Sequence, residues 1–274
     1  MKREHWKIAE LPWDTFDPAK VNPDLLAIVK AAALVEYNAH DYAAYLGNVF
    51  PDDEAFKRAM VAWSLEETQH GEALGRWAER ADPSFDFAAA VTRYTAGYKI
   101  NLNTQESIRG SHAGELIARC IVETGTSSYY TALGDAAEEP VLKAICRNIA
   151  ADELRHYKLF YDYLKTYLER EKLSRLERLK IGLARMQESE DDELAYAYFA
   201  ANAPANAAFD RKRYTSAYMI RAYQFYRRDH VERVVAMAFK ACGFKPHTVW
   251  QGMANRVAWW LMQTKTKRAL AKAA

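Results

Sequence analysis

Two short blocks of this sequence repeat each other and carry the same pair of side chains. Glu67 and His70 form one Glu-x-x-His block, and Glu153 and His156 form a second one, 86 residues later (67 to 153). Residues three apart on an α-helix lie on the same face, so a carboxylate and an imidazole at this spacing can reach one metal ion. Each block therefore predicts half of a metal site on a helix.

A lone glutamate precedes each block at nearly the same distance. Glu36 lies 31 residues before Glu67, and Glu123 lies 30 residues before Glu153. This separation fits two antiparallel helices joined by a short turn. A segment with Gly and Pro occurs in the middle of both intervals, at 47–53 and 134–140. The sequence therefore predicts a duplicated helical hairpin with all the candidate ligands at one level.

The helical periodicity places these polar side chains on apolar seams. The expected helices cover 24–47, 53–79, 113–133 and 140–170. Burying four carboxylates without compensating cations would cost several kcal/mol per ion, and the seams carry no Lys or Arg partners. Two divalent ions would balance the four charges. We therefore predict a dinuclear metal site with six ligands: Glu36, Glu67, His70, Glu123, Glu153 and His156.

Other acidic residues near the blocks are weaker candidates. Glu115 lies on the same expected helix as Glu123 and is an alternative ligand, but it breaks the repeat. Glu66 and Glu72 fall off the apolar seam, so we expect them to be solvated or to support the ligands from outside. Carboxylate and imidazole ligands favour iron(II) or manganese(II) over thiophilic metals.

Length and composition limit the class of protein. The chain has 274 residues, a net charge of +2 and three widely spaced cysteines, which we interpret as reduced core residues. The charge disfavours nucleic acid as a partner. The N-terminal residues lack the apolar run of a secretory signal, and no apolar stretch is long enough to span a membrane. We therefore predict a cytoplasmic protein.

Three regions follow from the pattern. Residues 1–23 contain three prolines and are expected to lie extended across the bundle, which covers 24–170. Residues 171–274 are expected to be a helical extension packed on the bundle. This extension is basic and rich in tryptophan. We interpret it as solvated helices with an aromatic underside against the bundle; a docking face for an acidic partner is the alternative.

The two blocks also resemble a known family. In the contexts AWSLEETQHGEAL and NIAADELRHYKLF they look like the diiron signatures of the soluble acyl-[acyl-carrier-protein] desaturases, within the ferritin-like superfamily. Trp63, Asp152 and Thr126 stand where that family has a Trp before the first block, an Asp before the second, and a Thr after the lone Glu. The resemblance implies an all-α, ferritin-like four-helix bundle of two hairpins with a long crossover, plus additional C-terminal helices.

The resemblance further implies a cofactor, a reaction and partners. It implies two iron ions, with a manganese/iron pair as the alternative, that use O2 and an electron donor such as ferredoxin. Asp152 would hold a ligand histidine, and Thr126 would assist oxygen activation. The substrate would be lipid-like or bound to acyl carrier protein, and it would be desaturated or hydroxylated.

The sequence leaves alternatives open. The chain is shorter than a typical desaturase, so the substrate is less constrained than the metal site. A hydroxylase of a quinone precursor or a tRNA remains an alternative, as does ferritin- or rubrerythrin-like iron oxidation with peroxide handling. A homodimer is one option for the assembly.

Overall fold

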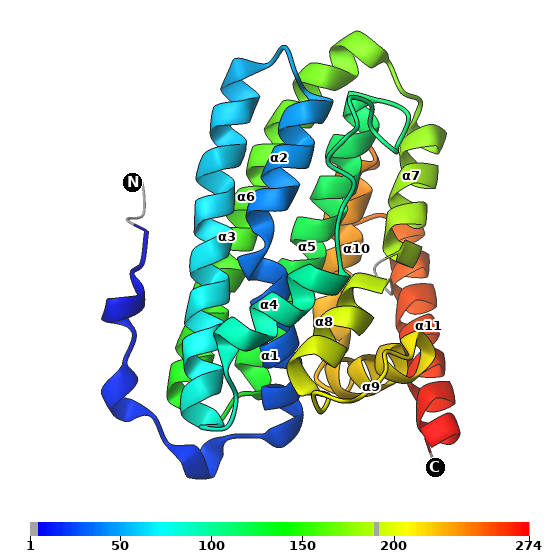
Figure 1. Cartoon of the computed structure of the whole chain (residues 1–274). Helices are drawn as coiled ribbons and strands as arrows, with labels where there is room; N and C mark the ends of the chain where they lie inside the picture. The colour runs from blue at the N-terminus through cyan, green and yellow to red at the C-terminus, as the bar shows by residue number, and fades with distance from the viewer. Residues whose placement is uncertain (1–4, 189–191, 274) are drawn as a thin grey trace.

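The computed structural model describes residues 5–188 and 192–273, and every regular element in these ranges is a helix (Figure 1). The predicted all-α fold is therefore confirmed. Residues 1–4, 189–191 and 274, which belong to the predicted terminal regions, lie outside the described residues. The 3-10 helices are η1 (Ile8–Glu10), η2 (Trp13–Thr15) and η3 (Pro18–Lys20). The α-helices are α1 (Pro23–Tyr37), α2 (Ala39–Val49), α3 (Glu54–Ala81), α4 (Phe87–Gly97), α5 (His112–Ala136), α6 (Pro140–Glu171), α7 (Arg175–Glu188), α8 (Asp192–Asn202), α9 (Arg211–Tyr223), α10 (Arg228–Ala241) and α11 (Val249–Ala273).

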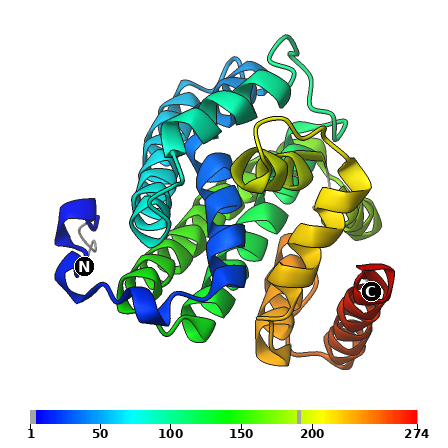
Figure 2. The ribbon, with the colours of Figure 1, turned by 60° about the horizontal axis from the view of Figure 1, so that its bottom comes forward.

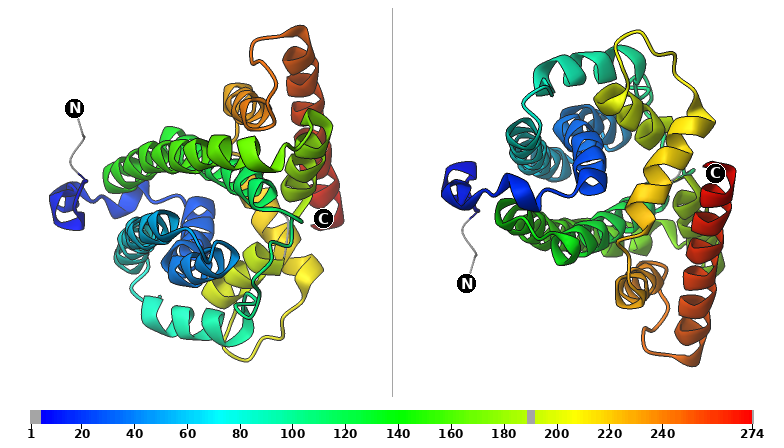
Figure 3. Two further views of the ribbon diagram at one scale, coloured as in Figure 1. Left: turned by 90° about the horizontal axis from the view of Figure 1, so that it is seen from above. Right: turned by 90° about the horizontal axis from the view of Figure 1, so that it is seen from below.

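Two helical hairpins form the centre of the molecule. In the first, α1 and α2 pack along α3; in the second, α5 packs along α6. Figure 3 shows the two hairpins side by side when the molecule is viewed from above and from below. Helices α3 and α6 also contact each other, so the two Glu-x-x-His helices are neighbours.

The core of this arrangement has two apolar parts. One contains the C-terminal half of α3 and the N-terminal half of α6, including Leu74, Trp77 and Leu142. The other contains the opposite halves of the same helices, including Met60 and Phe160. Along both helices the Glu-x-x-His block lies between these two parts. The candidate ligands therefore form a polar layer between two apolar regions.

The first ligand helix is interrupted, contrary to the continuous helix predicted over 24–47. Helix α1 ends at Tyr37, and α2 begins after Asn38. The Asn38 N–H bonds to the carbonyl of Val35, three residues back, so the α-helical ladder stops there. Helix α3 approaches α1 closely here, because a Cβ on Gly71 would lie 2.5 Å from the Tyr37 nitrogen. The break therefore comes two residues after Glu36, next to a close contact between the two helices.

The remaining helices surround the hairpins. Helix α4 lies within the crossover between them, α7 and α10 pack on α5, and α8 and α9 pack on α1. Helix α11 lies at the margin, against α10 and α9 (Figure 2). Trp250 and Trp260 of α11 are 72% and 63% exposed, so the expected packing of these two rings on the bundle is wrong. None of the described helices combines the length and the apolar character that crossing a bilayer requires.

A buried ion pair ties α1 to the end of α3. The Lys30 Nζ is 2.6 Å from Asp82 Oδ2 and lies over the ring of Phe85. Lys30 is only 8% exposed, and Asp82 is the carboxylate that pairs with its buried ammonium group. The hydrogen bond from Lys30 is the main reason that the pKa of Asp82 is lowered, to about 2.

We expect Asp82→Asn to lower the free energy of unfolding by about 1–3 kcal/mol at pH 7, because a buried ammonium loses its charged partner. The lowered pKa means that the ionised carboxylate stabilises the fold above about pH 4. That stabilisation is lost as the pH falls towards about 2. Urea unfolding of both proteins at pH 7, 5 and 3 should show the difference at the first two values and a smaller one at pH 3. An equal difference at all three values would contradict this assignment.

Candidate metal centre

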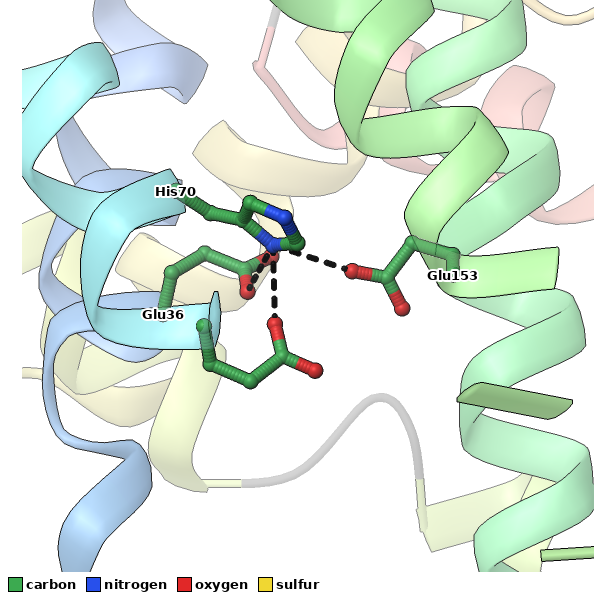
Figure 4. Close-up of side chains that lie close together, drawn as sticks. Glu36, His70 and Glu153 are labelled. Carbon is green, nitrogen blue, oxygen red and sulfur yellow. Dashed lines mark hydrogen bonds and ion pairs between the residues drawn. The ribbon is translucent and has the colours of Figure 1, made fainter. Parts of the chain in front are cut away.

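The six predicted ligands lie together in two overlapping groups. The first contains Glu36 of α1, Glu67 and His70 of α3, and Glu153 of α6 (Figure 4). The second contains Glu67 and Glu153 again, now with Glu123 of α5 and His156 of α6. Within each group the potential ligand atoms all lie within 4.8 Å of one another. The structure therefore has two buried groups that could each hold a metal ion.

Two carboxylates are shared between the groups. Glu67 places Oε2 2.9 Å from His70 Nδ1 and Oε1 3.0 Å from His156 Nδ1. Glu153 places Oε1 3.4 Å from His70 Nδ1 and Oε2 4.0 Å from His156 Nδ1. Each shared carboxylate thus presents one oxygen to each histidine.

The other two carboxylates serve one group each. Glu36 Oε2 lies 3.9 Å from His70 Nδ1, and Glu123 Oε2 lies 3.7 Å from His156 Nδ1. Both histidines therefore direct Nδ1 inward. There it faces the two shared carboxylates and the one carboxylate that belongs to its own group alone. The arrangement has the same twofold repetition as the sequence.

The outer nitrogen of each histidine meets a carboxylate of the opposite hairpin. His70 Nε2 is 3.1 Å from Asp152 Oδ2, and His156 Nε2 is 3.0 Å from Glu66 Oε2. Arg155 joins these two carboxylates, with Nη1 3.0 Å from Glu66 and Nη2 2.5 Å from Asp152. Carboxylates in this position fix the tautomer and the orientation of a ligand histidine. Glu66 thus supports the site from outside.

The N-terminal segment covers this outer side. The indole N–H of Trp6 donates to Asp152 Oδ2 over 2.8 Å, and its ring lies parallel to that of His70, with centroids 6.1 Å apart. The Gln69 amide in turn donates to the Trp6 carbonyl. Trp6 therefore shields His70 from solvent and holds Asp152 in place.

Two hydroxyl groups contact the carboxylates directly. The Thr126 hydroxyl lies 2.6 Å from Glu153 Oε2 and donates to a shared carboxylate. The Tyr130 hydroxyl donates to Glu36 Oε1 over 2.5 Å. The contact of Thr126 is compatible with the role that the family resemblance implies, which stays a prediction.

The alternative ligand Glu115 lies in neither group. It lies eight residues before Glu123 on α5. Its Oε2 accepts hydrogen bonds from the hydroxyls of Tyr45 and Ser107. Glu72 is exposed. Of the two candidate glutamates of α5, Glu123 thus lies in the cluster and Glu115 does not.

The electrostatics of the cluster show an excess of buried negative charge. Burial, and then the charges of the neighbouring carboxylates, raise the pKa values of Glu36 and Glu123 well above the usual range. Burial alone would lower the pKa values of His70 and His156, but the facing carboxylates raise both of them. The crowded negative charge thus disfavours the ionised forms of Glu36 and Glu123 and favours the protonated forms of the two histidines.

Several inward atoms are also left without hydrogen bonds. Glu123 Oε2, Glu153 Oε1 and His156 Nδ1 are buried and have no hydrogen-bond partner among the described residues. Buried polar atoms without partners are uncommon in native structures. Six oxygen and nitrogen donors with four formal negative charges fit two divalent cations in number, charge and ligand type.

The comparisons with known proteins assign no family. No family model matches the chain, and no curated protein matches its sequence.

The outer carboxylates give a testable prediction. We expect Asp152→Asn to weaken metal binding about 10- to 100-fold, because His70 loses the acceptor that fixes its inward nitrogen. Glu66→Gln should do the same through His156. Competition with a chelator of known affinity measures the effect. Glu72→Gln, which changes an exposed residue on the same helix, is the control and should leave the affinity unchanged.

Proposed function

We propose that this chain is an O2-dependent diiron oxidoreductase built on a ferritin-like four-helix bundle. We further propose that it desaturates or hydroxylates a substrate that is lipid-like or bound to acyl carrier protein. The observation that carries the proposal is the pair of buried ligand groups that share Glu67 and Glu153. A shared pair of carboxylates holds two ions close together, as a reaction at a dinuclear centre requires.

The donor set favours iron. Carboxylate and imidazole donors suit iron(II), and a manganese/iron pair is the alternative with the same ligand chemistry. When bound, two irons supply the reductive activation of O2 for attack on an unactivated C–H bond, with electrons from an external donor such as ferredoxin.

The residues of the chain have separate tasks in this proposal. Glu36 and Glu123 would each help to hold one ion, and Glu67 and Glu153 would help to hold both. Asp152 and Glu66 keep the two imidazoles in one tautomer with Nδ1 facing inward. The Thr126 hydroxyl holds a proton at Glu153 Oε2.

The surroundings of the site favour an apolar substrate. The buried ring of Trp63 packs edge-on against His156 and against the buried ring of Phe160. The apolar parts of the core on either side exclude water from the polar layer. A dry environment strengthens the electrostatic interactions at the site and protects an oxidising reaction from side reactions with solvent.

The family resemblance gives independent support. Asp152 contacts a candidate ligand histidine, as the desaturase-like pattern implies, and Thr126 contacts a candidate shared carboxylate. The resemblance is what assigns a role to both residues. The all-helical fold agrees with the same class of protein.

The proposal predicts two iron ions per chain and an O2 reaction that a substrate accelerates. Anaerobically iron(II)-loaded protein would be mixed with O2 in a stopped-flow instrument, with and without a long-chain acyl substrate, and the acyl chain analysed by mass spectrometry. Loss of two hydrogen atoms indicates desaturation, and gain of one oxygen atom indicates hydroxylation. Fast O2 consumption that does not depend on the acyl substrate, and that continues as iron is added in excess, would contradict the proposed reaction. It would indicate oxidation of iron instead.

A further inference from the structure

A buried arginine lies on the same face of α5 as the candidate ligand Glu123. Arg119 precedes Glu123 by four residues, which places it on the same helical stripe, about 6 Å away along the axis. It is only 8% exposed. Its guanidinium lies over the ring of Tyr42 of α2, 5.2 Å from the centroid. A positive charge is therefore held inside the helices, one turn from the metal centre.

This guanidinium lacks a close anionic partner. The ion pair that Arg119 makes within the described residues joins Nε to Glu115 Oε1 at 3.9 Å, beyond hydrogen-bond distance. Nε is buried and has no hydrogen-bond partner. Glu115 is instead hydrogen-bonded by Tyr45 and Ser107. Because arginines are rarely buried unless they are paired, this position points to a missing anion.

A second arginine reaches the same place from α7. Burial lowers the pKa of Arg185, and the positive charge of nearby Arg119 lowers it further. No hydrogen bond or ion pair joins Arg185 to another described residue. Among the described residues, therefore, Arg119 has an ion pair with Glu115 at 3.9 Å but no hydrogen-bonded carboxylate, and Arg185 has no ion pair.

A further buried carboxylate near both arginines, that of Glu193, is hydrogen-bonded by other groups. Glu193 of α8 accepts hydrogen bonds from the hydroxyls of Tyr42, over 2.6 Å, and Tyr94, over 2.9 Å. Burial raises the pKa of Glu193, while the two hydroxyls and the two arginines lower it. Among the described residues, Glu193 thus accepts from the two tyrosines and makes no ion pair with either arginine.

We infer that Arg119 and Arg185 bind the carboxylate of a free organic acid, which is the substrate of the metal centre. Guanidinium groups match carboxylates in shape and charge, and one monoanion would supply the partner that both arginines lack. A carboxylate held at Arg119 would place carbon atoms a few bonds away at the level of Glu123. An acyl chain on a carrier protein is a thioester without a carboxylate, so the pair favours a free acid.

That the bound acid is a substrate rests on the proposed function, but binding of a carboxylate by the two arginines can be tested separately. Octanoate would be titrated into the full-length chain without added metal by calorimetry, so that coordination to a metal cannot contribute. We expect octanoate to bind and its neutral analogue octanamide to bind at least tenfold more weakly. Arg119→Met and Arg185→Met should each weaken octanoate binding tenfold or more.

The control is Arg228→Met, which removes an exposed arginine paired with Glu232 on α10. It should leave octanoate binding unchanged. Equal binding of octanoate and octanamide, or unchanged affinity in both arginine variants, would overturn the inference. If Arg119→Met does not fold, the octanoate affinities of Arg119→Lys and of Arg185→Met are compared with that of the unaltered chain instead. Both should be lower, and Arg185 is only partly buried.

Iron content separates this inference from the proposed function. Both arginine variants should retain two irons per chain, because neither residue belongs to a ligand group. If octanoate binding depends on the arginines but the chain takes up no iron, the carboxylate site is supported and the proposed function is contradicted. If the chain binds two irons but octanoate binding does not depend on the arginines, only the inference about the carboxylate site is contradicted.

Discussion

Replacing Glu153 with alanine is expected to remove both metal ions from the chain, whereas replacing Glu36 with alanine is expected to remove one. Glu153 offers one oxygen to each ligand group, while Glu36 belongs only to the group of His70. Glu67→Ala and Glu123→Ala should show the same contrast for the other shared and private carboxylates. Native mass spectrometry of iron-loaded protein, with total iron measured in parallel, counts the ions on each variant.

The contrast between variants is more informative than the loss itself. Glu115→Ala is the matched control, since it removes a buried carboxylate of α5 that lies outside both groups, and it should retain two irons. Circular dichroism should show that all variants keep their helices. A single ion remaining on Glu153→Ala, or no ion on Glu36→Ala, would mean that the carboxylates are not shared as the distances indicate.

Much of this cluster is predictable from the sequence because its ligands obey local spacing. A Glu and a His three apart share a helix face whatever surrounds them. The repetition at an offset of 86 or 87 residues then ties the lone Glu36 to Glu123. Charged residues on an apolar seam need a common explanation, and a metal site provides one. These arguments need no knowledge of which helices touch.

Contacts between hairpins are not predictable in this way. Glu66 meets His156 only because α3 and α6 pack together, and its position off the apolar seam favoured solvent as strongly as a supporting role. One sequence signal was available, since Glu66 precedes Asp152 by the same offset of 86. The repeat therefore makes Glu66 and Asp152 equivalent positions in the two halves, which predicts the same supporting role for both.

The break at Asn38 and the position of Trp6 depend on tertiary packing. Asn is only a modest helix breaker, so its presence does not predict an interruption. The close approach of Gly71 to Tyr37 is what distinguishes this position, and it involves residues on different helices. The stacking of Trp6 on His70 likewise joins residues far apart in the chain. Local periodicity carries no information about either contact.

Gly71→Ala is expected to lower the free energy of unfolding by about 3 kcal/mol and to weaken metal binding at the same time. The added Cβ would lie 2.5 Å from the Tyr37 nitrogen and 2.7 Å from its Cα. These are backbone atoms that cannot rotate away, so α1 and α3 must separate. Glu36 directly precedes Tyr37, and the same displacement moves it away from His70. Urea unfolding and chelator competition measure the two effects.

Gly125→Ala is the matched control on the other lone-glutamate helix. A Cβ at Gly125 meets no atom within 4 Å, and alanine has the higher helix propensity, so this variant should be unchanged or up to about 1 kcal/mol more stable. If Gly71→Ala behaves like Gly125→Ala, the close approach of the two helices does not fix Glu36. A loss of stability with unchanged metal affinity would show that Glu36 is positioned independently of the Tyr37 backbone. Loss of both properties in Gly71→Ala alone would establish that one helix contact supports the fold and the ligand together.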